Sequence, residues 1–130
     1  MTPLAPASIR PPFARYSHGL VVPEGWRLVA VSGQLGVRPD DTAPEDAQMQ
    51  AALCLSNIEA ILAEASLDRH AILRLNAYVT DRAHMAGYMA ARDAFLAGVT
   101  PPPASTLMIV SGFTRPEFKV EVEALAAGPA

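Results

Sequence analysis

The segment 45–65 places its apolar residues at intervals of three and four positions, which is the period of one face of an α-helix. Glu45 and Asp46 stand in the expected first turn, where the helix dipole favours carboxylates. A helix with one apolar face needs a second layer to bury that face, so the segment predicts a layered fold. The apolar face comprises Ala51, Leu55, Ile58, Ile61, Leu62 and Ala65.

The next segment, 71–80, alternates strictly and predicts a strand with an apolar and a mixed face. The apolar face should lie under the helices, whereas the mixed face needs a polar or intersubunit environment. Arg74 on the mixed face is expected to be a structural ion-pair partner. The apolar face holds Leu73, Leu75, Ala77 and Val79, and the mixed face holds Ile72, Arg74, Asn76 and Tyr78.

Four further strands and a second helix are expected. The turn Pro23-Glu24-Gly25 predicts that the first two strands form a hairpin. Asp81 is a plausible N-cap for a second helix that runs to about Leu96. The expected strands besides 71–80 lie at 16–22, 26–32, 105–110 and 118–126.

The predicted order is therefore β-β-α-β-α-β-β, which is an α+β architecture with a mixed sheet and two helices on one face. A chain of 130 residues is most simply one domain, here 13–127. Residues 1–12 are expected to form an extended arm, because prolines forbid a regular helix there. These prolines are Pro3, Pro6, Pro11 and Pro12.

Composition limits the partners of this chain. It is 51% hydrophobic and only 18% charged, against averages of about 45–50% and about 25% for soluble domains. Such a chain has little polar material to cover its surface, which favours an oligomer and excludes a disordered protein. The net charge is −3, and the basic residues are scattered without a cation-rich stripe, so no nucleic-acid partner is expected.

The single Cys54 excludes an internal disulfide framework and favours a reducing, cytoplasmic compartment. No apolar run is long enough to span a membrane, and the proline-rich start does not resemble a signal peptide. His18, His70 and His84 lack metal-ligand spacing, so no metal is expected. The segment 33–36 is too short for a dinucleotide or phosphate-binding fingerprint, and no cofactor is expected.

Six short segments, in register along about residues 12–127, resemble the signatures of the RidA/YjgF family, formerly labelled endoribonuclease L-PSP. The resemblance implies a chorismate-mutase-like α+β fold and a homotrimer with three clefts between its subunits. It also implies a small-molecule ligand in those clefts, with hydrolysis of reactive enamines and imines to a keto acid and ammonia. The segments are Tyr16–Gly19, Val31–Gly36, Gln50–Leu62, Tyr78–Asp81, Pro103–Thr106 and Val120–Ala124.

The cleft positions implied by the resemblance are Tyr16, Ser32, Gly33 and Thr106 for substrate binding and Glu121 for catalysis. The roles are physically reasonable. A carboxylate at Glu121 can hold a water against the imine carbon or transfer its proton. The backbone N–H of Gly33 can approach a substrate oxygen because no side chain intervenes, and Tyr16 offers a flat apolar wall and a hydroxyl.

The departure from the family pattern that matters most lies in the segment Pro102–Thr106. The active deaminases carry an arginine there that grips the substrate carboxylate, and in this chain either Ala104 stands in its place or the position is deleted. A charge-assisted contact of this kind contributes about 1.5–3 kcal/mol. We therefore expect poor hydrolysis of 2-aminoacrylate, unless another cation such as Arg92 or Arg115 takes this role.

Three functions compete at this point. The first is an enamine or imine hydrolase, or a related lyase, whose substrate lacks the usual carboxylate, and the second is a non-catalytic metabolite-binding trimer. The third is a ribonuclease, which the sequence pI of about 5.5 disfavours. Simpler interpretations also remain open: Glu121 and Glu123 can be solvated residues of an edge strand, Tyr16 and Ser32 can pack in an interface, and His18 can be a surface residue.

Overall fold

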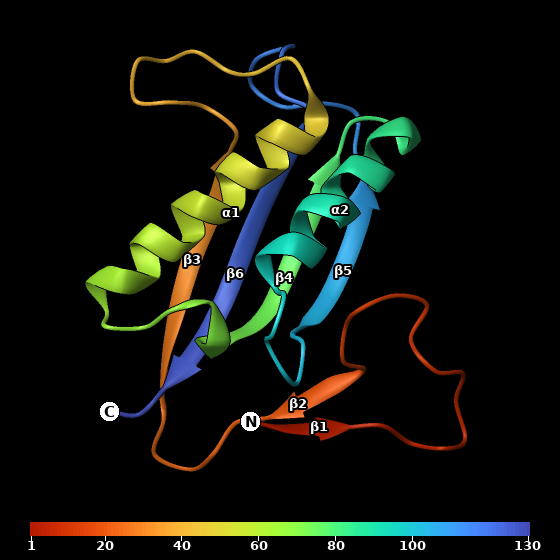
Figure 1. The fold of residues 1–130 in the computed structure, drawn as a ribbon, viewed down its shortest axis with the longest axis vertical. Coiled ribbons are helices and arrows are strands. Elements are labelled where there is room, and N and C mark those ends of the chain that lie inside the picture. The colour runs from red at the N-terminus through yellow and green to blue at the C-terminus, as the bar shows by residue number, and fades with distance from the viewer.

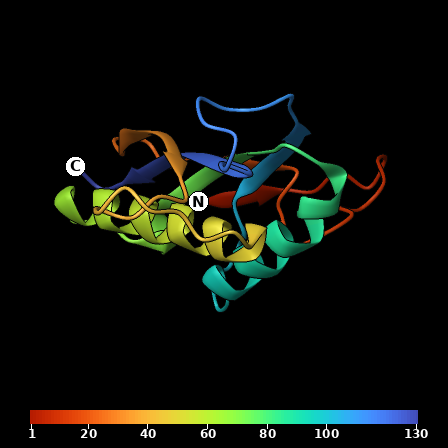
Figure 2. The same ribbon diagram turned by 90° about the horizontal axis from the view of Figure 1, so that it is seen from above.

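A four-stranded mixed sheet with two helices on one face forms the body of the computed structural model, which describes all 130 residues (Figure 1). In spatial order the strands are β3 (Arg27–Leu35), β6 (Val120–Gly128), β4 (Ile72–Val79) and β5 (Ala104–Ile109). Strand β4 runs parallel to β5 and antiparallel to β6, and β3 is antiparallel to β6. Figure 2 shows both helices on the same side of the strands. The predicted α+β class is thereby confirmed.

Helix α1 (Ala47–Glu64) begins where the sequence places an acidic cap. Asp46 is its N-cap rather than a first-turn residue, and its carboxylate accepts the N–H of Met49 at 2.9 Å. Ile61, which was expected on the buried face, is 38% exposed. The buried face of the helix includes Gln50 and Cys54 instead. The buried residues of α1 are Ala47, Gln50, Ala51, Cys54, Leu55, Ile58 and Leu62.

The second helix is preceded by a separate turn. Asp81 caps a short 3-10 helix, η2 (Arg82–His84), and accepts the N–H of Ala83 at 2.8 Å. Helix α2 (Met85–Phe95) follows directly and packs beside α1 over the sheet. A further 3-10 turn, η1 (Arg69–Ala71), leads from α1 into β4.

The predicted hairpin between the first two strands is wrong. The turn itself is present: the N–H of Trp26 donates to the Pro23 carbonyl at 3.3 Å. Strand β2 (Gly19–Val21), however, pairs with an additional N-terminal strand, β1 (Thr2–Leu4), while β3 finds its partner in β6. A turn fixes only the local chain direction, and the long β6 ladder decides where β3 lies. The predicted order thus lacks one strand, and part of the predicted arm 1–12 is paired.

The alternation of β4 is broken once. A bulge between Ile72 and Arg74 shifts the register against β6 by one residue. Ile72 is therefore buried with the core, and Leu73 moves to the other side, which reverses the prediction for these two residues. From Arg74 onward the predicted faces hold: Leu75, Ala77 and Val79 are buried.

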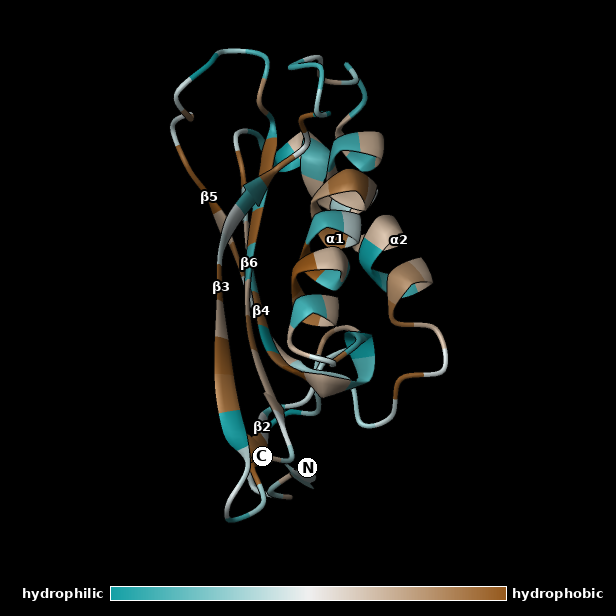
Figure 3. Ribbon diagram, turned by 90° about the vertical axis from the view of Figure 1, so that its left-hand side faces the viewer, coloured by the Kyte–Doolittle hydropathy of each residue, from teal (hydrophilic) through white to brown (hydrophobic).

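The core lies between the sheet and the helices, and it leaves the opposite sheet face without a covering layer (Figure 3). No helix of the structure is long and apolar enough to cross a membrane.

Candidate functional site

The uncovered face of the sheet carries a connected group of polar side chains. Arg74 donates through Nε to Asn76 Oδ1 at 2.8 Å and through Nη2 to Thr106 Oγ1 at 2.6 Å. Glu123 Oε1 accepts from Asn76 Nδ2 at 3.1 Å and from the Tyr78 hydroxyl at 2.6 Å. These five residues, here called the polar network, join β4, β5 and β6. Arg74 therefore bonds to neutral oxygens and is not the ion-pair partner that we expected.

The network changes the titration of one of its members. The hydrogen bond to the Glu123 carboxylate, with burial as a smaller cause, raises the pKa of Tyr78 above its ordinary value. Tyr78 thus stays a neutral hydroxyl that donates to Glu123 at any physiological pH.

Glu121 lies on the same face of β6, beside Tyr78 on β4 and Leu35 on β3. The predicted alternation holds here, since Val120 and Val122 are fully buried while Glu121 and Glu123 are only half-buried. No group of the chain donates a hydrogen bond to the Glu121 carboxylate. Burial, followed by repulsion from Glu123, raises the pKa of Glu121. A half-buried carboxylate without a donor is suited to accept a proton.

Gly33 approaches Glu121 closely. The register between β3 and β6 shifts between Val31 and Gln34, so Ser32 and Gly33 bulge out of the ladder and stay exposed. A Cβ atom on Gly33 would lie 2.6 Å from Glu121 Oε1 and 2.7 Å from its Cδ. A side chain at this position would therefore displace the Glu121 carboxylate from the place it occupies.

Tyr16 lies apart from these groups in this single chain. Its hydroxyl accepts the N–H of Phe13 at 3.1 Å, and its ring meets His18 edge-on with 6.0 Å between centroids. Ser17 anchors the segment to the loop before β5, where it donates from its backbone to Pro103 and from Oγ to Pro102. The structure thus brings Gly33 to Glu121, with Ser32 beside it in the same bulge, and ties Thr106 to the polar network, but it leaves Tyr16 outside.

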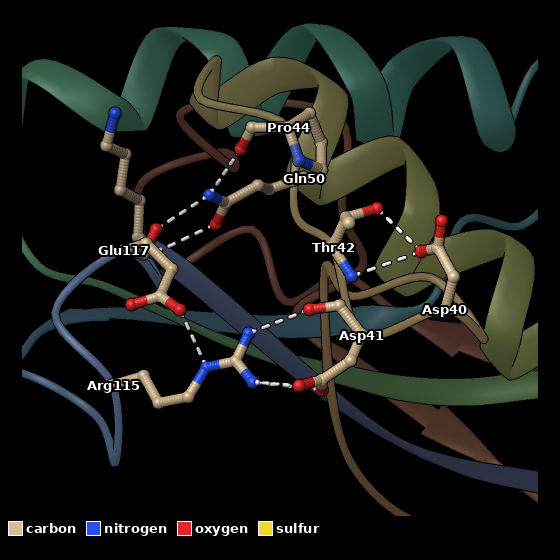
Figure 4. Close-up of polar contacts among 8 residues, drawn as sticks. Asp40, Asp41, Thr42, Pro44, Gln50, Arg115 and Glu117 are labelled. Carbon is tan, nitrogen blue, oxygen red and sulfur yellow. Dashed lines mark hydrogen bonds and ion pairs between the residues drawn. The ribbon is translucent and has the colours of Figure 1, made fainter.

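A buried latch fixes the start of β6, two residues before Glu121 (Figure 4). Gln50 is fully buried on α1, and its Nε2 donates to the carbonyls of Pro44 and Glu117 at 2.8 and 2.9 Å. Its Oε1 accepts the N–H of Lys119 at 2.8 Å. A buried side chain with all its hydrogen bonds satisfied rigidifies its surroundings, so Gln50 ties the start of β6 to helix α1.

Neither arginine suggested as a substitute cation lies on the uncovered face. Arg92 is 3% exposed on α2 and pairs with Asp93 at 3.1 Å. Arg115 makes a two-pronged contact with Asp41, at 2.9 Å to each oxygen, and pairs with Glu117 at 2.7 Å (Figure 4). Both guanidinium groups therefore act in local structure, one at α2 and one between two loops.

Cys54 is fully buried, and its Sγ contacts the Val120 carbonyl at 3.8 Å. Burial raises the pKa of this thiol to about 12, so it is a packing residue rather than a nucleophile. The structure holds no cluster of three or more histidine, cysteine, aspartate or glutamate residues that fits a metal ion.

Sequence reasoning on the site missed Asn76, Tyr78 and Glu123 as a bonded group. The signal that was available is the mixed face of segment 71–80, which placed Asn76 and Tyr78 on one side. The sequence does not show that Glu123 is their partner across the sheet, because Glu123 lies 47 positions from Asn76 and 45 positions from Tyr78.

Comparisons with known proteins agree on one relationship. The family model described as Endoribonuclease L-PSP matches residues 7–128. Similar solved structures include a protein of the conserved Rid family, YyfB from Yersinia pestis, with 26% identity, 97% of each chain covered and a TM-score of 0.84. The YjgF gene product from E. coli is 30% identical, with 94% of this chain and 91% of that chain covered and a TM-score of 0.71.

A third similar structure, E. coli TdcF with bound serine, is 27% identical and has a TM-score of 0.71. The match covers 98% of this chain and 93% of the TdcF chain. No curated protein sequence matches the chain.

Proposed function

The chain belongs to the endoribonuclease L-PSP family of Rid and YjgF proteins, and from this premise we propose that it hydrolyses an enamine or imine of a small metabolite at Glu121. One observation carries the proposal: Glu121 is a half-buried carboxylate with a raised pKa and no donor from its own chain. It stands at the end of a fixed polar network, beside the backbone of Gly33. Serine bound to TdcF supports a small polar molecule as the ligand.

The proposed reaction needs one base and no cofactor. Glu121 takes a proton from a water molecule as the water oxygen bonds to the imine carbon, and the same proton passes to the nitrogen. The hydroxyl proton of the resulting carbinolamine then passes, through Glu121, to the amino group; the C–N bond breaks, ammonia leaves and a carbonyl compound remains. Gly33 leaves its N–H accessible to a substrate oxygen, while Thr106 and Ser32 offer hydroxyl groups on the same exposed face.

The site is proposed to lie in a cleft between subunits of a homotrimer. The uncovered sheet face supports this, since it carries exposed apolar side chains beside the polar network. A cavity of about 270 Å³ opens on that face next to Asn76 and Glu123. A second subunit would cover this face and would bring the missing wall, including the position of Tyr16, to Glu121. The single buried Cys54 fits a cytoplasmic location.

Assembly is tested by light scattering at micromolar concentration. We expect three times the 13.8 kDa mass of one chain. Leu125 on the open sheet face and Ile61 on α1 are 39% and 38% exposed, so they form a matched pair. Leu125→Glu should lower the assembled mass, whereas Ile61→Glu should not. A monomeric wild-type protein would exclude the trimer.

Activity is tested with imines released in situ, one from an amino acid by an amino-acid oxidase and one from a primary amine by an amine oxidase. We expect the wild-type protein to accelerate ammonia release from at least one of them. A non-catalytic binder remains the second candidate, favoured by Ala104, which offers no functional group. Binding of a metabolite without any acceleration would support the binder and refute the hydrolase.

A further inference from the structure

Two glutamates follow each other on the uncovered face of β6, and the chain surrounds them differently. Glu123 and Glu121 are both half-buried, and they lie opposite Asn76 and Tyr78 of β4 in the antiparallel ladder. One oxygen of Glu123 accepts from both Asn76 and Tyr78, at 3.1 and 2.6 Å. Glu121 accepts from neither, although Tyr78 is its direct partner in register. The Tyr78 hydroxyl thus bonds to the next carboxylate along the face rather than to the one opposite it.

The cation that β4 places on this face lies on the Glu123 side of the pair. Arg74 is opposite Leu125, which follows Glu123 on the same face and is further from Glu121. Arg74 donates from Nε to Asn76 Oδ1 at 2.8 Å, and the Asn76 amide donates in turn to Glu123. Hydrogen bonds in such a chain polarise one another, so the positive charge of Arg74 favours the ionised form of Glu123.

No cation pairs with Glu121 from the elements packed around it. Strand β3 places no ionisable side chain beside it. Lys119, at the start of β6, donates from Nζ to the carbonyl of Glu45. Cys54, on the helix side of the sheet, is a neutral thiol, because burial raises its pKa to about 12. The charged group that acts on Glu121 is therefore Glu123, which is the second cause, after burial, that raises the pKa of Glu121.

From this asymmetry we infer that Glu123, fixed by Tyr78 and Asn76, is a positioning residue: it stays ionised, and its charge keeps Glu121 a strong proton acceptor. Two carboxylates whose surroundings favour opposite protonation states divide the acid and base roles between them. Tyr78 acts through Glu123 and needs no contact with a substrate. The inference rests on the proposed function only for the use of the Glu121 proton in imine hydrolysis, because the division of charge belongs to the folded chain itself.

The test is the titration of both carboxylates in the substrate-free protein, followed by NMR of glutamate labelled with ¹³C at its side-chain carboxyl. Glu123→Gln keeps an oxygen that accepts from Tyr78 and Asn76, and it removes the charge. Charges two strand residues apart, about 6.6 Å, repel enough at a partly buried surface to move a pKa by about one pH unit. The Glu121 step should therefore fall by about one pH unit in Glu123→Gln. It should stay in place in the control Glu64→Gln, at an exposed position on α1. An unmoved Glu121 step in Glu123→Gln would overturn the inference.

A second variant, Tyr78→Phe, keeps the ring and removes only the donor to Glu123. Loss of a hydrogen bond to a charged group should raise the Glu123 step by about one pH unit, so the two steps move closer together. If Tyr78 serves only to pack against the sheet, both steps keep their wild-type positions, which contradicts the inference.

Turnover separates this inference from the proposed function. On the imine that the wild type hydrolyses, the acidic limb of kcat should move to lower pH in Glu123→Gln by the same amount as the NMR step, with KM unchanged. A moved NMR step in a protein that hydrolyses no imine would refute the proposed function and keep the inference. Imine hydrolysis with the same acidic limb and the same Glu121 step in Glu123→Gln and wild type would refute the inference and keep the proposed function.

Discussion

Glu121→Gln lowers imine turnover by about 10²–10⁴-fold, which is the usual contribution of general acid–base catalysis. Glutamine keeps the shape of the side chain beside Gly33 and Tyr78 and removes its ability to carry a proton. The measurement is kcat on the imine that the wild type hydrolyses, together with the assembled mass. Glu64→Gln, at an exposed position near the end of α1, is the matched control and should keep full activity. Wild-type turnover by Glu121→Gln would show that another group moves the proton.

The pH dependence of the wild type follows from the same carboxylate. Turnover needs the ionised form, so it should rise with pH through a pKa above the ordinary range of glutamate, because burial and Glu123 both raise it. Glu121→Gln should lack this acidic limb, whereas Glu64→Gln should retain it. An unshifted limb in the wild type would argue against a desolvated Glu121.

The raised pKa also has a consequence for stability with a definite sign. Between the ordinary and the raised pKa, the native state binds the Glu121 proton and the unfolded chain does not. The unfolding free energy therefore falls as pH rises through that interval, and an ionised Glu121 destabilises the fold at neutral pH. Glu121→Gln should unfold at the same temperature as the wild type or higher at pH 7, so a loss of activity cannot be attributed to unfolding.

Local patterns in the sequence predicted the elements of this fold well. Periodicity located the first helix and the alternating faces of β4 and β6, including the shared side of Glu121 and Glu123, and the Asp81 cap signal located the second helix. Each of these signals depends only on neighbours in the chain. The hairpin prediction failed because the pairing of β2 with β1 and of β3 with β6 is decided by distant segments. The reversed faces of Ile72 and Leu73 have the same origin, since a bulge exists only relative to a partner strand.

The same distinction between local and long-range features applies to the candidate site. The family resemblance pointed to Gly33 and Glu121 as separate positions, and the structure adds their close approach, which depends on the β3 bulge. The prediction for Arg74 used only the sequence of its own strand, where a single cation suggests an ion pair. The folded sheet shows instead that Arg74 bonds to Asn76 on its own strand and to Thr106 Oγ1 across the parallel ladder.

Gly36→Ala and Gly33→Ala, three residues apart, should separate stability from activity. A Cβ on Gly36 would lie 2.6 Å from both Cα and Cβ of Gln50 and 2.8 Å from its carbonyl oxygen. Gln50 is fully buried and held by three hydrogen bonds, so it cannot move away without breaking the latch at β6. Overpacking of this kind costs about 3 kcal/mol, and in a domain of this size the melting temperature should fall by about 10 °C.

The same methyl group on Gly33 meets a different neighbour. All the atoms near it belong to the flexible end of the Glu121 side chain, and neither glycine has a positive φ, so the backbone tolerates alanine at both positions. Gly33→Ala should therefore melt within a few degrees of the wild type, while the displaced carboxylate lowers turnover by about 10²-fold. Thermal unfolding and kcat are measured on both variants. Wild-type turnover in Gly33→Ala would mean that the position of Glu121 does not matter for the chemistry, and a wild-type melting temperature in Gly36→Ala would mean that Gln50 does not hold β6 rigidly.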